Sequence, residues 1–478
     1  MTQGARGFGR VLGVIASVAL GSLSVAPAWA SGIIAQFQGG AFGQSGFVPP
    51  EMGGGVGDGD VVQLLNGVAT IDTTAGNQVS QPSLNSFFGV PTTTPLSDPR
   101  VIYDPTGQRW FASVITVPGG SLSSQNSILL AVSSDANPTS GFTTLSFLSA
   151  NSTSAADYPT LGVNNAAVTI GTNDFSTTAG TYIASSLYSI PKSSLTAPTP
   201  ALTGMASFTQ SNQVGFTPEG VTNTAGTGTS TSVLSTGVNS AGTQLVYALS
   251  TVAGANTAGA TLALTQTYNQ PFSNSLIAPI QPGGTTYDSG GTRIGSGAYQ
   301  SGSNIYFANT VSNGSVDEIA WNVLNATTSS LSTGLIGISG LDLTYGSISA
   351  NANGTFVVTF NGSGTSQNIT DYYVICSSVT NTCGTPQVAC TSPANNYNLV
   401  AGGRNRWGDY SWTTVDPNNP NNFGLFQEYA SSNSSWATVI TEIGTAASSA
   451  APEPGAASVL AVGLLGLLAS RRRRRAGG

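Results

Sequence analysis

The fold is decided by one stretch, Ser97-Asp98-Pro99-Arg100-Val101-Ile102-Tyr103-Asp104, which is followed after four residues by Arg109-Trp110-Phe111. An Asp-Pro turn opens a short run of β-branched and aromatic residues, and a second such run follows a polar turn. Runs of this kind, bounded by Gly, Asn, Pro or Ser, are typical of β-strands. The pattern recurs along the chain, and no stretch between residues 31 and 450 has the composition of a long helix. We therefore expect an all-β fold.

The strand runs are grouped into repeating units that begin with a turn and an acidic or aromatic residue. The spacings between successive starts are 47, 59, 59, 77, 52 and 64 residues, counted from Glu51, Asp98, Asp157, Phe216, Arg293, Tyr345 and Asp409. Seven units of about 60 residues match four-stranded blades with generous loops. We predict a seven-bladed β-propeller over residues 49–445, because radial closure protects strand edges. A pair of β-sandwiches or a parallel β-solenoid remains an alternative.

The last unit contains too few strands for a complete blade. Only about three runs fit between Asp409 and Ile443, whereas a propeller blade has four strands. We expect a strand from before Glu51 to complete this blade, although residues 31–48 otherwise form a Gly-rich segment.

Three motifs resemble blades of the seven-bladed, sialidase-like propellers. They are the opening stretch, Asp157-Tyr158-Pro159-Thr160-Leu161-Gly162-Val163 and Arg406-Trp407-Gly408-Asp409-Tyr410-Ser411. The resemblance implies a site at the channel mouth that uses an arginine cluster, a Tyr-Glu pair and an acid. The repeated Ser-x-Asp-x-Gly-x-Thr-Trp box of that superfamily is missing here. A sialidase-like hydrolase that uses carboxylates at the channel mouth is therefore the alternative, and we favour a non-catalytic protein that binds polysaccharide or another protein.

Six charged residues at the predicted blade starts form a candidate ring facing the central channel: Asp98, Arg100, Asp157, Arg293, Arg406 and Asp409. They either bind a ligand or pair with one another and tie neighbouring blades together, since buried charges are rarely left unpaired. If the role is structural, each guanidinium should lie within about 3 Å of a carboxylate or a carbonyl.

Composition excludes several classes of function. Of the residues between 31 and 445, 19 are acidic and six are basic, so the body should not bind nucleic acid. The chain has no histidine, which removes Ser-His-Asp and Cys-His catalysis and histidine metal sites. We expect no cofactor. Calcium binding remains an alternative at Asp58, Asp60 and Asp416, whose carboxylates lie on turns that contain Gly or Pro. The ordinary preference of Asp for turns also explains these residues.

The cysteines are few and evenly spaced. Cys376, Cys383 and Cys390 are the only ones in the chain. In an oxidising compartment two of them should form a disulfide and leave one free. The spacing does not decide which two.

The pattern of residues 1–30 predicts a secretory signal peptide. Two arginines precede an apolar segment, and Ala28-Trp29-Ala30 supplies small residues at the −3 and −1 positions. We expect a signal helix that signal peptidase removes after Ala30.

The C-terminal end has three parts after a linker at residues 446–451. Pro452-Glu453-Pro454 precedes a 16-residue apolar stretch, and Arg471, Arg472, Arg473, Arg474 and Arg475 follow. The apolar stretch suits a transmembrane helix, and the arginines act as a cytoplasmic stop. This tail resembles the PEP-CTERM sorting signal over residues 452–478. The resemblance implies transient residence in the inner membrane, processing by an exosortase, and a surface or extracellular role in exopolysaccharide or biofilm of a Gram-negative bacterium. A permanent single-span anchor is the alternative.

Processing at both ends is the first testable consequence. Intact-mass measurement of the protein from an exosortase-positive host should show a chain that starts at Ser31 and lacks the arginine run. Recovery of chains that still carry Arg471 to Arg475 would contradict the sorting assignment.

Overall fold

The computed structural model describes residues 32–312 and 314–445. Within them, helix is limited to α1 (Phe42–Ser45), α2 (Leu84–Phe87), α3 (Lys192–Leu195) and the 3-10 turn η1 (Pro118–Gly120). The all-β prediction is confirmed. No helix in this part of the chain is both long and apolar enough to span a membrane. The predicted signal helix and C-terminal transmembrane helix lie outside the described residues.

Short antiparallel sheets follow one another along the chain. The first comprises β2 (Gly53–Gly57), β3 (Asp60–Leu65), β4 (Val68–Thr73) and β5 (Gln78–Ser80). The second comprises β6 (Leu96–Asp104), β7 (Arg109–Thr116), β8 (Ser127–Ser133) and β9 (Phe142–Leu148). The third comprises β10 (Ser154–Asp157), β11 (Gly162–Val163), β12 (Ala167–Ser176), β13 (Tyr182–Pro191) and β14 (Ala206–Phe208). Here β10 and β11 both pair with β12 and together form the inner strand.

The next two groups of strands merge into one eight-stranded sheet. One half is β15 (Phe216–Thr222), β16 (Thr231–Val238), β17 (Gln244–Ala253) and β18 (Thr261–Ser273). The other half is β19 (Ala298–Ser301), β20 (Asn304–Ser312), β21 (Asp317–Asn325) and β22 (Ser330–Ile336). A short parallel pairing of β15 with β19 joins the two antiparallel halves.

The remaining strands form two further sheets and a short two-stranded ribbon. β23 (Asp342–Ala350), β24 (Thr355–Gly364), β25 (Gln367–Ser377), β26 (Thr382–Cys383) and β27 (Gln387–Thr391) form one sheet. A two-stranded ribbon, β28 (Val400–Ala401) and β29 (Arg404–Asn405), follows. The last sheet contains β30 (Trp412–Val415), β31 (Asn422–Ser432), β32 (Ser435–Gly444) and the N-terminal strand β1 (Gly32–Ala41).

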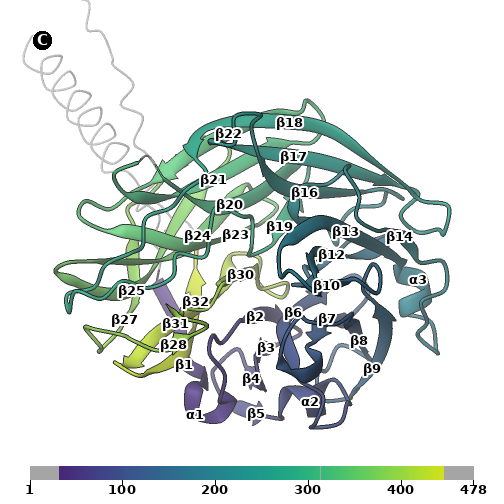
Figure 1. Cartoon of the computed structure of the whole chain (residues 1–478), viewed down its shortest axis with the longest axis horizontal. Helices are drawn as coiled ribbons and strands as arrows, with labels where there is room; N and C mark the ends of the chain where they lie inside the picture. Colours follow the sequence, from purple (N-terminus) through teal and green to yellow (C-terminus); the bar gives the residue numbers. More distant parts are fainter. Residues whose placement is uncertain (1–31, 313, 446–478) are drawn as a thin grey trace, which may run out of the picture. The chain divides into compact units, whose positions relative to one another are not determined.

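The sheets are arranged as a ring in sequence order (Figure 1). Their innermost strands form a closed circuit, in which β2 contacts β6, β6 contacts β11, β11 contacts β15, β15 contacts β19, β19 contacts β23, β23 contacts β30, and β30 contacts β2. This is the architecture of a β-propeller rather than of paired sandwiches or a solenoid.

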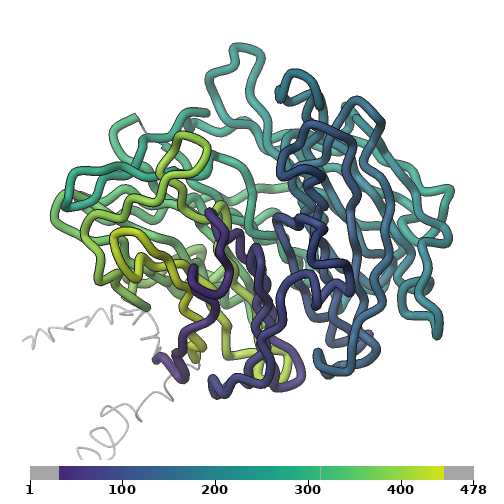
Figure 2. Tube along the Cα trace, turned by 60° about the horizontal axis from the view of Figure 1, so that its bottom comes forward, coloured from purple at the N-terminus to yellow at the C-terminus, as the bar shows by residue number. Residues whose placement is uncertain are grey.

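The N-terminal strand closes the ring. β1 pairs with β32 in antiparallel register, with Phe37 opposite Ile440, and Figure 2 shows the two ends of the described chain side by side. The predicted strand from before Glu51 is therefore confirmed. It lies at the start of the Gly-rich N-terminal segment, where Ile33 to Phe37 supply the β-forming residues.

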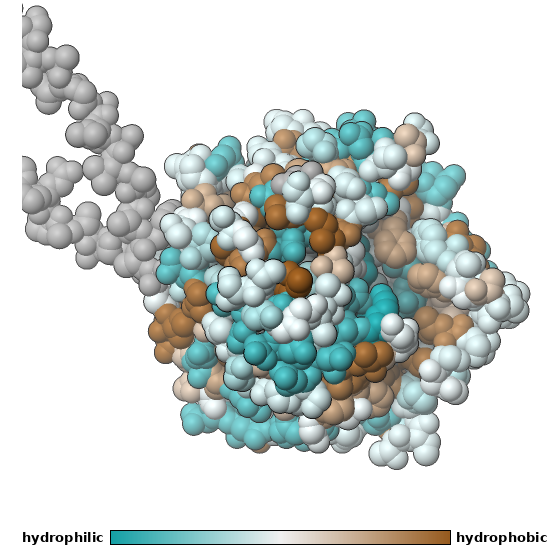
Figure 3. Space-filling model, turned by 60° about the vertical axis from the view of Figure 1, so that its left-hand side comes forward, coloured by the Kyte–Doolittle hydropathy of each residue, from teal (hydrophilic) through white to brown (hydrophobic). Residues whose placement is uncertain are grey.

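Apolar side chains fill the spaces between successive sheets. Val62, Leu64 and Trp110 belong to a cluster between the first and second sheets, and comparable clusters separate the later ones. On the face shown in Figure 3, hydrophobic residues are interspersed with hydrophilic ones. The largest apolar cluster joins residues of the first, second, third, sixth and last groups of strands, so much of the core is continuous from sheet to sheet.

One disulfide links the ends of a hairpin in the sixth group of strands. Cys376 of β25 is bonded to Cys383 of β26, and Cys390 of β27 is a free thiol. The bridge closes a short local loop.

Glycine allows the inner strands to approach closely. A Cβ atom added to Gly162 of β11 would lie 2.3 Å from the carbonyl oxygen of Gly220 in β15. Since that neighbour is backbone, it cannot move aside without shifting a strand of the inner circuit.

Gly162→Ala should therefore lower the free energy of unfolding by about 1–3 kcal/mol, the usual cost of overpacking. Gly237→Ala is the matched control, because Gly237 also lies in a strand but has no atom within 4 Å of an added Cβ. Denaturant unfolding measures both. Equal stability of the two variants would contradict the tight inner circuit.

Candidate functional site

A hollow of about 450 Å³ lies at one mouth of the ring, where the inner strands begin. We call it the mouth pocket. Its charged lining residues are Glu51, Asp98, Asp157, Asp288, Arg293, Arg404, Arg406 and Asp409. Five of the six predicted ring residues thus meet in one pocket, and Arg100 is the exception.

β-Bulges recur in the inner strands, and one of them places Asp98 in the lining of the mouth pocket. The pairing of the inner strand with its neighbour shifts register between Ser97 and Arg100 in β6, and corresponding shifts occur in β15 and β23. Each bulge holds one residue with positive φ, namely Asp98 (61°), Thr217 (55°) and Tyr345 (57°). A bulge re-aims a side chain, and positive φ is unfavourable for Thr and Tyr. The same strained geometry is therefore used at equivalent places in three sheets.

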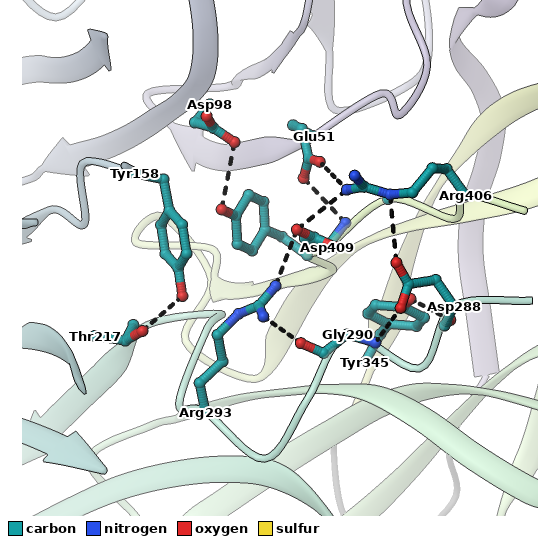
Figure 4. A network of polar contacts seen from close by, with 12 residues as sticks. Glu51, Asp98, Tyr158, Thr217, Asp288, Gly290, Arg293, Tyr345, Arg406 and Asp409 are labelled. Carbon is teal, nitrogen blue, oxygen red and sulfur yellow. Dashed lines mark hydrogen bonds and ion pairs between the residues drawn. The ribbon is translucent and has the colours of Figure 1, made fainter. Parts of the chain in front are cut away.

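Two arginines sit in a network of carboxylates (Figure 4). Arg293 pairs with Asp409 at 3.0 Å, and its guanidinium also donates to the carbonyl oxygen of Gly290. Arg406 pairs with Asp409 and Glu51, each at 3.3 Å, and with Asp288 at 3.4 Å. The partners come from the segments before β2, β19 and β30, so the network ties separate sheets together.

A third arginine lies at the edge of this network. Arg404 pairs with Asp288 at 2.9 Å, but 61% of its side chain is exposed. Exposed ion pairs contribute little to stability.

Asp98 and Asp157 lack such partners. The hydroxyl of Tyr410 donates to Asp98 at a distance of 3.4 Å. Within residues 32–312 and 314–445, the Asp157 carboxylate has neither a hydrogen bond nor an ion pair. Burial, reinforced by repulsion from Asp409, raises the pKa of Asp98 to about 6. Burial and repulsion from Asp98 and Asp409 raise the pKa of Asp157 to about 7, although Arg293 and Arg406 oppose the shift.

Arg100 does not join the ring of ion pairs. It is fully buried, its three nitrogens have no hydrogen-bond partner among the described residues, and its guanidinium carbon lies 3.6 Å from the Tyr410 ring centroid. Glu219 is also fully buried without a hydrogen bond, and burial raises the pKa of its carboxyl to about 8. The expectation that each arginine would lie about 3 Å from a carboxylate or carbonyl holds for Arg293, which is 3.0 Å from Asp409, and for Arg406, which is 3.3 Å from Glu51. It is wrong for Arg100. Aromatic faces surround Arg100 instead, in a cation–π arrangement.

Sequence reasoning missed part of the network. The sequence predicts Glu51 and Tyr345 as starts of units but not as site residues, and it does not single out Asp288 or Arg404. Asp288 precedes a Ser-Gly-Gly turn that leads to Arg293, which was the available signal. Tyr345 donates its hydroxyl hydrogen to the carbonyl oxygen of Asp288 and so fixes that loop.

The calcium candidates remain apart from the mouth pocket. Asp58 and Asp60 flank the turn between β2 and β3, and Asp416 accepts a hydrogen bond from the backbone of Asn418 at 2.8 Å. Among the described residues, no group of three or more Cys, Asp or Glu side chains could hold a metal ion. Turn chemistry accounts for Asp416.

A second hollow adjoins the mouth pocket. It has a volume of about 530 Å³ and shares Phe216 and Arg293 with the mouth pocket. We call it the side hollow. Tyr182 lines it with 43% of its surface exposed, and the ring contacts Phe216 edge-on at 5.1 Å between centroids. The Phe175 ring also contacts Tyr182, with 5.9 Å between the ring centroids. The charged mouth pocket is thus continuous with an aromatic wall formed by Tyr182 and Phe216.

This chain is similar to known proteins in structure but not in sequence. No family model and no curated protein matches the sequence. A Penicillium chrysogenum alpha-L-arabinanase complexed with arabinobiose is 10% identical, with a TM-score of 0.37, over 86% of this chain and 98% of that one. A Trypanosoma rangeli sialidase in complex with the inhibitor DANA is 8% identical, with a TM-score of 0.39, over 85% and 59%. An exo-beta-1,3-galactanase from Clostridium thermocellum is 12% identical, with a TM-score of 0.33, over 86% and 96%. These similarities assign no substrate to this chain.

Arg406→Ala should lower the free energy of unfolding by about 3–5 kcal/mol, because it leaves the buried Glu51 without a cationic partner and removes one of the two arginines that pair with Asp288 and with Asp409. Arg404→Ala removes another partner of Asp288 from an exposed position, so it should cost less than about 1 kcal/mol. Chemical denaturation compares the two. Similar losses in both variants would contradict a structural role for the buried network.

Proposed function

We propose that this chain is an exported, seven-bladed β-propeller that binds polysaccharide across the mouth pocket and the side hollow. The blade count is supported by the closed circuit of inner strands, once the eight-stranded sheet is divided at the parallel β15–β19 pairing. The single observation that carries the binding proposal is the junction of a charged pocket with an exposed aromatic wall.

The chemistry of this junction suits sugars. Sugar hydroxyls both donate and accept hydrogen bonds, so they match a lining that contains both carboxylates and guanidiniums. The apolar faces of sugar rings pack against aromatic rings, and Tyr182 and Phe216 present such rings beside Arg293. The two hollows have room for more than one sugar unit, since pockets of a few hundred Å³ hold drug-sized ligands.

The ion pairs that the arginines already make argue against an acidic sugar as the ligand. Arg293 and Arg406 already neutralise Asp409, Glu51 and Asp288. A sialic or uronic acid carboxylate would have to compete with these built-in partners. The network therefore supports a structural role for the arginines and a ligand without a carboxylate.

A hydrolase is the second candidate function. Asp98 and Asp157 favour it, because a carboxyl with a pKa near neutrality can act as a general acid. Release of reducing ends from a bound polysaccharide, lost in Asp157→Asn, would support catalysis over simple binding.

Export and sorting form part of the same proposal. The signal peptide at residues 1–30 and the Pro452-Glu453-Pro454 tail with its arginine run support passage through the inner membrane and exosortase processing. The disulfide between Cys376 and Cys383 fits an oxidising compartment outside the cytoplasm. The cell surface or extracellular matrix of a Gram-negative bacterium would then supply exopolysaccharide as the partner.

The binding proposal is tested by glycan-array screening, followed by calorimetry with the best polysaccharide. Tyr182→Ala should weaken binding by up to about tenfold, the loss expected when one aromatic contact is removed. Tyr268→Ala in β18 is the control, because Tyr268 is partly buried and lines neither hollow. Absence of binding to any polysaccharide, or equal affinities of the two variants, would refute the proposal.

A further inference from the structure

The mouth pocket has more negative than positive groups. Five carboxylates and three guanidiniums line it. All three guanidiniums are within ion-pair distance of Glu51, Asp288 or Asp409. Two carboxylates, Asp98 and Asp157, are left without a cationic partner among the described residues.

These two acids belong to neighbouring sheets and lie against the same hollow. Asp98 lies at the β6 bulge, and Asp157 ends β10. Their mutual repulsion contributes to the raised pKa of Asp157. Each carboxylate would be stabilised by a positive group placed between them, since an opposite charge favours the ionised form.

The identity of that positive group follows from the lining. A divalent metal ion normally requires more carboxylate or carbonyl ligands, and no group of three or more metal-binding acids or cysteines occurs in the described residues. An ammonium group has three N–H donors on one small centre. Such a group can donate to more than one carboxylate, and the same pocket lining supplies Phe175 and Phe216, against which a carbon skeleton can pack.

We propose that the mouth pocket selects polysaccharides that carry free primary amines, such as de-N-acetylated amino sugars, and that Asp98 and Asp157 bind the ammonium group. This inference rests on the proposed glycan-binding function. It adds a chemical class of ligand and assigns the two unpaired acids to its recognition.

The proposal gives a direction for the pH dependence of binding. Asp157 faces Asp98, Asp409, Arg293 and Arg406, and all but the arginines raise its pKa. As the pH falls through about 7 and then about 6, Asp157 and Asp98 take up protons and lose the charge that attracts an ammonium. The amine of an amino sugar also takes up its proton near neutrality, so affinity for an amino sugar should be highest near pH 7 and fall from there to pH 5, where both acids are neutral. Affinity for the acetylated sugar should change little.

The test is calorimetry of the full-length protein with a glucosamine tetramer and with its N-acetylated counterpart at pH 7, where part of the amine is protonated and part of the acid is ionised. The free-amine tetramer should bind at least about tenfold more tightly, as expected for a hydrogen bond to a charged group. Asp157→Asn should abolish this preference and leave binding of the acetylated tetramer within about twofold. Asp135→Asn, at an exposed turn outside the pocket, should keep the preference.

The possible failures are distinguishable. Equal binding of the two tetramers by the wild-type protein would overturn the amine proposal and leave glycan binding intact. Binding of neither tetramer would refute recognition of amino sugars, and the glycan array would then decide the wider function. The amine proposal would also be overturned if Asp157→Asn kept the preference for the free-amine tetramer, or if tetralysine bound as tightly as that tetramer. Either result would mean that the acidic protein attracts any cation without a specific site.

Discussion

The structure depends on one pairing, that of β1 with β32 across the ends of the described chain. Every sheet in a ring must find a neighbour on both faces, and an open ring would leave one sheet with an exposed apolar face and unpaired strand edges. Here the N-terminal strand completes the sheet formed by the last three strands, so the first and last parts of the sequence are joined by backbone hydrogen bonds. The aromatic and aliphatic clusters between sheets can then be buried all the way around.

The candidate site is a consequence of this closure. Glu51 stands just before the first inner strand, and Arg406 stands before the last one, yet their side chains are 3.3 Å apart. An ion pair between residues 355 positions apart exists only because the ring brings its two ends together. Once the arginines are neutralised by Glu51, Asp288 and Asp409, the remaining acids give the pocket its electrostatic character. Structure and recognition therefore share the same charged residues, with the arginines stabilising the mouth and the unpaired acids available for a ligand.

The sequence predicted the strand-rich fold, the repeating starts and the need for an additional N-terminal strand, because these follow from local patterns and strand counts. It also placed five of the six ring residues, since acids and arginines at equivalent starts of inner strands must meet at the axis. The burial of Arg100 among aromatic rings, outside the ring of ion pairs, could not be predicted from the sequence. The bulge at Asp98 and Pro99 turns that strand, so Asp98 is directed to the pocket while Arg100 packs against Tyr410. Asp288 was missed because it lies in a long loop between β18 and β19, whose path is set by tertiary contacts with Tyr345 and Arg406. Which cysteines pair likewise depended on the hairpin register that places Cys376 opposite Cys383.

The central claim is that β1 is an integral strand that closes the ring. Hydrogen–deuterium exchange of the backbone amides tests it directly, because exchange reports the opening of each strand. Closure predicts that amides of β1 that are hydrogen-bonded to β32 exchange as slowly as those of β31 and through the same cooperative opening. Exchange of β1 at the rate of an unstructured peptide, while β31 and β32 stay protected, would contradict the account.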